Sequence, residues 1–363
     1  MATSTPTRNV LESAPKVLLH DHLDGGLRPL SVIELADETG YAGLPTQDPA
    51  ELATWMTRGA DRKDLVLYLD TFAHTTGVMQ TADALYRVAV ECAEDLLADG
   101  VVYAEVRFAP ELHTERGLSM DDVLEAVTSG FADASKDTAL TIRTICSAMR
   151  HERNSLEVSQ LAVRWRDRGV IGFDIAGPEK GFPPDDHVLA FQYAQRENFH
   201  FTIHAGEAYG PPSIWKALQW CGAERLGHGV RIVDDITVDE DGNAELGRLA
   251  HSIRDRRVPL EVCPTSNLHT GVVDDLADHP IKLFKDLKFR VTLNTDNRLM
   301  SNISMTGEME NMVRVFGWDL RDMQWLTVNA MKSAFLPFDE RLVLINEVIK
   351  PQYAQLIAEA EAS

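Results

Sequence analysis

Two histidines separated by one residue, His20 and His22, end a short apolar segment near the start of the chain. Side chains two positions apart on a strand point to the same face, so both imidazoles can bind one metal ion. A catalytic zinc site needs about three protein ligands and leaves one position open for water. By itself a His-x-His tripeptide is weak evidence, because about half of such pairs are surface accidents or satisfied core pairs. Ligands elsewhere in the chain must therefore decide the question.

Further residues of this kind occur in three later segments. His204 and Glu207 belong to His-Ala-Gly-Glu, His228 lies between two glycines, and Asp296 belongs to Asn-Thr-Asp-Asn. Each alone has an ordinary explanation, as a core histidine, a helix-capping histidine or a helix-capping aspartate. Together, three histidines and one aspartate suit a single zinc-like divalent ion that is bound by imidazole and carboxylate groups.

Two of these residues have properties that suit proton transfer. Glu207 follows His204 by three residues, so it can lie near the metal without binding it and act as a general acid if burial raises its pKa. The glycines beside His228 leave room for a substrate. Bound zinc lowers the pKa of water to about 7. These residues indicate a metal-assisted hydrolase that acts on a small polar molecule.

The elements that must position these residues alternate regularly between strand and helix patterns. Eight strands are predicted, at residues 17–20, 101–108, 140–147, 170–176, 199–204, 225–228, 258–263 and 289–295. Such a chain is typical of a single-domain α/β fold, the (β/α)8 TIM barrel, whose active site lies where the strands end. The histidines, Glu207 and Asp296 all lie at strand ends. We expect a flexible tail at residues 1–14 and a barrel with C-terminal helices at 15–363.

Two charged segments have structural interpretations. Glu105 and Arg107 share the inner face of the strand at 101–108, which suggests a buried ion pair with a structural role. The acidic stretch 230–242 lacks the ligand spacing of a calcium loop, and a solvated loop is favoured.

Composition excludes several classes of partner. The 363 residues include 56 acidic and 35 basic ones, a formal net charge of −21 that repels nucleic acids and anionic membranes. The N-terminal residues do not resemble a signal peptide, and no apolar run is long enough to span a membrane. The cysteines are scattered, which is typical of reduced thiols in the cytoplasm: Cys92, Cys146, Cys221 and Cys263. The sequence leaves the oligomeric state open.

The motifs, taken in order, resemble the adenosine deaminase family of the amidohydrolase superfamily. The resemblance runs from about residue 16 to 337 and rests on residues 20–25 (His-Asp-His-Leu-Asp-Gly), 105–108, 204–207, 225–229, 263–267, 293–296 and 329–337. It implies one zinc ion per chain, held by His20, His22, His204 and Asp296. By this resemblance Glu207 protonates N1 of the purine, while His228 and Asp296 orient and deprotonate the water that attacks C6. Ammonia then leaves and inosine forms.

The resemblance also implies contacts to a purine nucleoside. Asp24 would bind the ribose 5′-hydroxyl, and the backbone of Gly177 would contact N3. Relatives that act on free adenine tend to carry Glu at the position of Asp24, so adenosine and 2′-deoxyadenosine of purine salvage are the expected substrates. Residues 65–72 resemble an apolar gate over the pocket, although a helix packed on the barrel is an equal alternative.

Two residues depart from the family pattern. Asn297 replaces the second of two aspartates and would meet purine N7, where an amide can donate its own N–H but a carboxylate needs a shared proton. Pro178 stands where many relatives have Asp, next to Gly177.

Two other functions stay open at this point. The same site can deaminate another 6-aminopurine conjugate, such as aminodeoxyfutalosine. A catalytically inactive barrel that only binds nucleosides is the second, although such a protein has no need of Glu207. The nucleic-acid deaminase fold is excluded, because its Pro-Cys-x-x-Cys motif does not occur.

Overall fold

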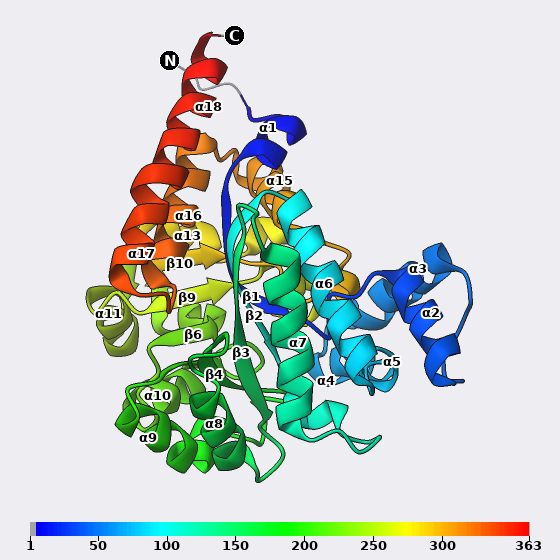
Figure 1. Cartoon of the computed structure of the whole chain (residues 1–363). Helices are drawn as coiled ribbons and strands as arrows, with labels where there is room; N and C mark the ends of the chain where they lie inside the picture. Colours follow the sequence, from blue (N-terminus) through cyan, green and yellow to red (C-terminus); the bar gives the residue numbers. More distant parts are fainter. Residues whose placement is uncertain (1–4, 363) are drawn as a thin grey trace.

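The computed structural model describes residues 5–362 and contains a barrel of eight parallel strands (Figure 1). The strands follow one another around the barrel in chain order: β1 (Lys16–His22), β2 (Val101–Phe108), β3 (Thr141–Met149), β4 (Val170–Ala176), β5 (His200–Ala205), β6 (Arg225–His228), β9 (Pro259–Val262) and β10 (Arg290–Leu293). The chain after β10 meets β1, where the His22 amide donates to the Asp296 carbonyl at 2.7 Å. The predicted TIM barrel is confirmed.

Helices that connect consecutive strands form an outer layer around the barrel (Figure 1). They are α6 (Ala82–Ala98), α7 (Met120–Ser135), α8 (Ser155–Arg164), α9 (Val188–Arg196), α10 (Pro211–Gln219), α11 (Arg248–Asp255) and α13 (Ile281–Asp286), followed by α16 (Leu320–Ser333). The helix α7 begins with a capping box. The Ser119 hydroxyl accepts from the Asp122 amide at 3.1 Å, and the Asp122 carboxylate accepts from the Ser119 amide at 3.0 Å. Its buried face then packs on the barrel.

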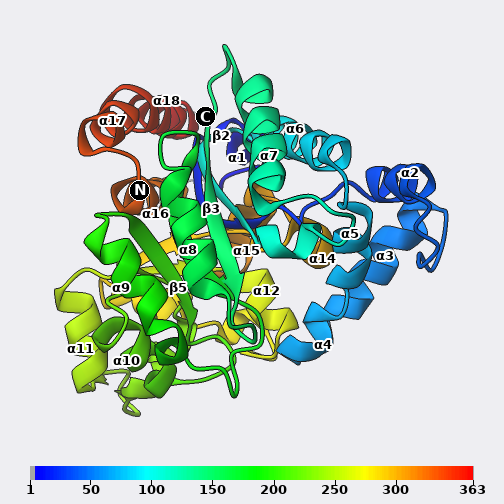
Figure 2. The same cartoon turned by 60° about the horizontal axis from the view of Figure 1, so that its bottom comes forward.

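The remaining helices extend this plan. Between β1 and β2 the helices α2 (Pro29–Thr39), α3 (Pro49–Ala60), α4 (Leu65–Leu69) and α5 (Phe72–Val78) stand to one side of the barrel (Figures 1 and 2). The other α-helices are α12 (Pro264–His269), α14 (Arg298–Ser301), α15 (Met305–Phe316), α17 (Phe338–Val343) and α18 (Lys350–Ala362). Short 3-10 helices are η1 (Pro110–His113), η2 (Pro184–His187), η3 (Val230–Asp235) and η4 (Leu276–Asp278), and η5 (Leu344–Ile349) is a π-helix. Within residues 5–362 no helix has the length and apolar character that crossing a membrane requires.

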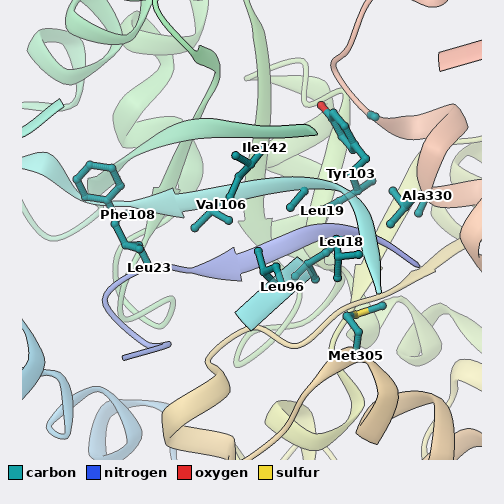
Figure 3. Packing of buried hydrophobic residues seen from close by; sticks show 14 of the residues in the cluster. Leu18, Leu19, Leu23, Leu96, Tyr103, Val106, Phe108, Ile142, Met305 and Ala330 are labelled. Atoms are coloured by element: carbon teal, nitrogen blue, oxygen red, sulfur yellow. The ribbon is translucent and has the colours of Figure 1, made fainter. Parts of the chain in front are cut away.

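The apolar core lies between the strands and the helices. Val106 and Phe108 on β2, with Leu18 on β1, are fully buried, and Figure 3 shows them with Leu96 of α6 and Met305 of α15. Burying each such side chain stabilises the fold by roughly 1.5–3 kcal/mol. This layer holds the strand ends, and hence the site, in fixed positions.

The predicted flexible tail is wrong for part of its length. Residues 8–13 form α1 (Arg8–Ser13), and Leu11 is completely buried against the core. The buried ammonium of Lys16 donates to the carbonyl oxygens of Leu11 and Ala14, at 2.7 and 2.9 Å, and so caps the end of α1. Residues 1–4 lie outside the described part of the chain.

The predicted ion pair between Glu105 and Arg107 is also wrong, although both residues are buried. Arg107 reaches across the barrel to Asp174 and Glu261, at 2.9 and 2.8 Å. Arg225 binds Glu261 and Glu105, both at 2.6 Å. Neighbouring inward side chains of one strand lie side by side, so their partners are on the other strands. The barrel interior is therefore one charged network.

The acidic stretch 230–242 is more ordered than a solvated loop. Val230 and Ile232 of η3 are buried, and the strands β7 (Ile236–Val238) and β8 (Ala244–Leu246) form an antiparallel hairpin. At its tip the Asp239 carboxylate accepts from the amides of Asp241 and Asn243. The acidic side chains thus shape a turn.

Candidate active site

Four of the predicted ligands converge where the strands end. His20 and His22 come from β1, His204 from β5, and Asp296 follows β10. Their donor atoms all lie within 4.8 Å of one another. His22 Nε2 is 3.3 Å from His204 Nε2, and His20 Nε2 is 3.3 Å from Asp296 Oδ1. The sequence-predicted cluster is therefore brought together in one place.

Buried carboxylates orient two of these histidines. Nδ1 of His20 lies 2.9 Å from Glu261 Oε2, and Nδ1 of His204 lies 2.7 Å from Asp174 Oδ2. Each carboxylate thereby turns the Nε2 lone pair of its histidine toward the cluster. His20 Nε2 is buried and has no hydrogen-bond partner within residues 5–362, which fits a nitrogen that binds a metal. Sequence reasoning missed Asp174 and Glu261, whose signal was one charged residue inside each apolar strand.

Asp296 is placed by its backbone and by a serine. Its φ of 61° is in the left-handed region, which non-glycine residues seldom adopt. Ser266 Oγ donates to Asp296 Oδ2 at 2.6 Å, which leaves Oδ1 facing His20 and His22. Burial favours the neutral acid, but the close imidazoles of His20, His228 and His22 hold the pKa of Asp296 well below its usual range. Asp296 is thus negatively charged and can bind a cation.

Glu207 lies beside this cluster on a loop that a second glutamate fixes. The Glu179 carboxylate accepts hydrogen bonds from four consecutive backbone amides, those of Gly206, Glu207, Ala208 and Tyr209, at 2.6, 3.1, 2.7 and 2.8 Å. Burial, and then the negative charges of Asp296 and Glu179, raise the pKa of Glu207 well above its usual range. The raised pKa favours the protonated carboxyl group, which can act as an acid. Sequence reasoning missed Glu179.

A chain of hydrogen bonds sets the protonation of His228, whose Nε2 is 3.6 Å from Glu207 Oε2. The Ile281 amide donates to His279 Nδ1 at 3.1 Å, so His279 Nε2 carries the proton and donates to Asn267 Oδ1 at 3.3 Å. The Asn267 amide group then donates to His228 Nδ1 at 3.1 Å. Burial, and then the charge of His20, lower the pKa of His228 well below its usual range. Neutral His228 is therefore assigned its proton on Nε2, facing the site.

A pocket of about 300 Å³ opens from the cluster toward solvent. One wall is apolar and comes from α4 and α5, the segment predicted as a gate. The side chains of this wall are Leu65, Val66, Tyr68, Leu69, Phe72 and Ala73. The opposite end is polar and contains His22, His204, Glu207, His228 and Asp296. The volume is at the lower end of the range for small-molecule sites.

The predicted substrate contacts also line this pocket, as does Pro178. Asp24 Oδ1 and Asn297 Oδ1 are buried without a hydrogen-bond partner within residues 5–362. Burial, and then the charges of Asp21 and Asp296, raise the pKa of Asp24 to about 7. Gly177 has φ 102°, so any L side chain would be strained there. The pocket thus contains buried polar groups that a bound ligand can satisfy by hydrogen bonding.

Comparisons with known proteins agree with this geometry. A family model described as adenosine deaminase matches residues 15–351. A protein named adenosine deaminase 1 from Streptomyces coelicolor is 61% identical over 98% of this chain and 91% of its own length. An adenosine deaminase from Mycobacteroides abscessus is 60% identical over 96% of this chain and 97% of its own length.

Solved structures show the same architecture. An adenine deaminase from Arthrobacter aurescens is 26% identical with a TM-score of 0.82, over 96% of this chain and 100% of that one. An amidohydrolase from Burkholderia ambifaria, solved with bound zinc, is 25% identical with a TM-score of 0.83, over 98% and 95%. Since the family model and the sequence relatives span nearly the whole chain, this protein belongs to the adenosine deaminase family.

Proposed function

We propose that this protein hydrolyses adenosine and 2′-deoxyadenosine to inosine and 2′-deoxyinosine, with release of ammonia, in purine salvage in the cytoplasm. The observation that carries the proposal is the buried cluster of His20, His22, His204 and Asp296 beside Glu207, whose pKa is raised by burial. The names of the relatives at about 60% identity support adenosine as the substrate.

One zinc ion would be held by His20, His22, His204 and Asp296. Imidazole and carboxylate donors suit zinc, and the buried Nε2 of His20 lacks another partner within residues 5–362. The structurally similar amidohydrolase from Burkholderia ambifaria was solved with bound zinc, which supports the choice of this metal. When bound, zinc supplies a nucleophile at neutral pH by lowering the pKa of a water to about 7.

Glu207 would act as the general acid. Its raised pKa favours the protonated carboxyl group, and that proton can be given to N1 of the purine ring. Protonation at N1 draws electrons from C6 and makes that carbon open to attack. Inosine keeps the hydrogen on N1, so Glu207 regains a proton from the attacking water. The second water proton leaves with the amino nitrogen as ammonia.

His228 and Asp296 would orient and deprotonate the attacking water from two sides. Neutral His228 presents an Nε2–H donor to the pocket, whereas ionised Asp296 presents an acceptor. This combination fixes the direction of the lone pair that attacks C6. In this arrangement His228 contributes orientation, and Asp296 contributes the basic group.

Three residues would recognise the nucleoside. The unpartnered Oδ1 of Asp24 can accept from the ribose 5′-hydroxyl, and the backbone of Gly177 can contact N3. The side-chain amide of Asn297 can donate its own N–H to N7, whereas a carboxylate would need a shared proton. Because an amide here also suits other purine conjugates, aminodeoxyfutalosine is the second candidate substrate.

A substrate panel tests the proposal. Purified protein is given adenosine, 2′-deoxyadenosine, adenine or aminodeoxyfutalosine, and the ultraviolet change is followed while zinc is measured on the same sample. We expect fast turnover of the two nucleosides with about one zinc per chain. Turnover of another 6-aminopurine alone, or none despite bound zinc, would contradict the proposed substrate.

A further inference from the structure

A second cavity, of about 390 Å³, lies at the opposite end of the barrel from the candidate active site. It is bordered by the residues that begin four strands: His200 of β5, Arg225 of β6, Pro259 of β9 and Arg290 of β10. Arg341 of α17 completes the rim, and Figure 1 shows α17 beside β9 and β10. The cavity is thus formed by the turns that enter the strands, away from the residues assigned above to catalysis.

Cations dominate the lining of this cavity. It contains one lysine and five arginines: Arg225, Arg256, Arg257, Arg290, Lys332 and Arg341. Glu224 is the single carboxylate among the described lining residues, and it is held by His200 at 2.8 Å. This local excess of positive charge contrasts with the chain as a whole, which has 56 acidic and 35 basic residues. A concave surface of one charge attracts ligands of the opposite charge.

Four of these guanidinium groups have no carboxylate partner within residues 5–362, those of Arg256, Arg257, Arg290 and Arg341. Arg341 Nη1 donates to the Lys332 carbonyl at 2.7 Å, and Arg257 Nη1 donates to the Lys288 carbonyl. The Nε atoms of Arg290 and Arg341 are buried without any hydrogen-bond partner in that range. Burial, and then the charges of Arg257 and Arg341, lower the pKa of Arg290. Such repulsion is relieved when an anion binds between the groups.

One wall of the cavity is built around Phe335, which is almost fully buried. The Phe335 ring stacks on the ring of His200, with centroids 4.8 Å apart and an angle of 4° between the planes. The Arg225 guanidinium carbon lies 3.6 Å from the centroid of the Phe335 ring. The Phe335 amide donates to Glu105 Oε1 at 2.6 Å, which fixes this wall. His200 and Arg225 therefore cover the Phe335 ring, and the cavity offers a ligand mainly charged groups.

We propose that this cavity is a binding site for a small phosphate-bearing anion, with the phosphate group between Arg257, Arg290 and Arg341. Planar guanidinium groups bind phosphate oxygens through paired charge-assisted hydrogen bonds. Free phosphate and a phosphorylated metabolite share this chemistry. The cavity volume of about 390 Å³ leaves room for an organic phosphate of about the size of a pentose phosphate.

Calorimetry with the zinc-loaded full chain tests the proposal. Inorganic phosphate, ribose 5-phosphate and ribose are titrated at constant ionic strength into the wild type, R290Q/R341Q and the control R164Q/R168Q. The control removes the same charge, but its two arginines are paired with Asp121 and Glu125. We expect ribose 5-phosphate to bind more tightly than phosphate, and ribose not to bind.

The variants locate the binding. R290Q/R341Q should weaken ribose 5-phosphate binding by about tenfold or more, whereas the control should stay within about twofold. Binding of inorganic phosphate alone, weakened in the same way, would assign the site to free phosphate. Absence of binding, or equal weakening in both double variants, would overturn the proposal. If R290Q/R341Q does not fold, R341Q alone on α17 serves the same comparison.

Discussion

The carboxylate of Glu179 lies 3.1 Å from the backbone nitrogen of Glu207 and also accepts from the three amides around it. One side chain thus fixes the loop that carries the proposed general acid. Its negative charge also contributes to the raised pKa of Glu207. Geometry and protonation of Glu207 consequently depend on the same residue.

The E179Q variant should separate these two contributions. We expect kcat to fall by about 10- to 100-fold, because a loosened loop misplaces Glu207. Loss of the Glu179 charge also lowers the pKa of Glu207, so the alkaline limb of the kcat/KM profile should move to lower pH. Zinc content should not change. The control E152Q removes an exposed glutamate and should leave the profile as it is. A fall in rate without a shifted limb would limit Glu179 to a structural role.

Asp174 and Glu261 should control metal affinity. D174N and E261Q remove the carboxylates that hold Nδ1 of His204 and His20, so zinc affinity should fall by about 10- to 100-fold. Competition with a chelator measures this. The matched control is E105Q, which disturbs the same buried network at Arg225 without contacting a histidine. Equal zinc loss in E105Q would show that general destabilisation is the cause.

Asn297 should determine how strongly purine N7 is recognised. In N297A the ratio of kcat/KM for adenosine to that for 7-deazaadenosine, which lacks the N7 acceptor, should fall toward one. The amide hydrogen bond is worth roughly 0.5–1.5 kcal/mol, or about 2- to 12-fold. A Pro178→Ala variant, also on the pocket wall, should keep the wild-type ratio. An unchanged ratio in N297A would remove Asn297 from the proposed contacts.

Glu308 predicts a stability that depends on pH. Burial raises its pKa to about 7, while Oε1 accepts from the Thr265 amide and Oε2 has no partner within residues 5–362. Below pH 4.5 the acid is neutral in both folded and unfolded chains. Between about 4.5 and 7 the unfolded chain releases this proton first, which costs the fold about 3 kcal/mol by pH 7.

The E308Q variant removes this cost. Its Tm should exceed that of the wild type above pH 7, and the difference should shrink as the pH falls toward 4.5. E340Q, an exposed position on α17, should show no such gain. A Tm difference that is constant across this pH range would contradict the interpretation.

The barrel and most of the site were predictable from sequence because the signals are local. The period-two pattern of residues 101–108 and the positions of His20, His204 and His228 at or near the ends of their strands need only neighbouring residues. The partners of Glu105 and Arg107 could not be predicted, because they depend on which strands face each other across the closed barrel. Likewise, the order of α1 depends on Leu11 meeting a surface that distant helices provide.

The central claim is that Glu207 supplies a proton and does not bind the metal. The most direct measurement is zinc content and adenosine turnover on one sample of E207Q, beside the wild type. Glutamine keeps the shape of the side chain but cannot deliver the carboxyl proton to N1. The account predicts about one zinc per chain and loss of turnover by at least about 10²-fold. Substantial residual turnover with zinc still bound would contradict it.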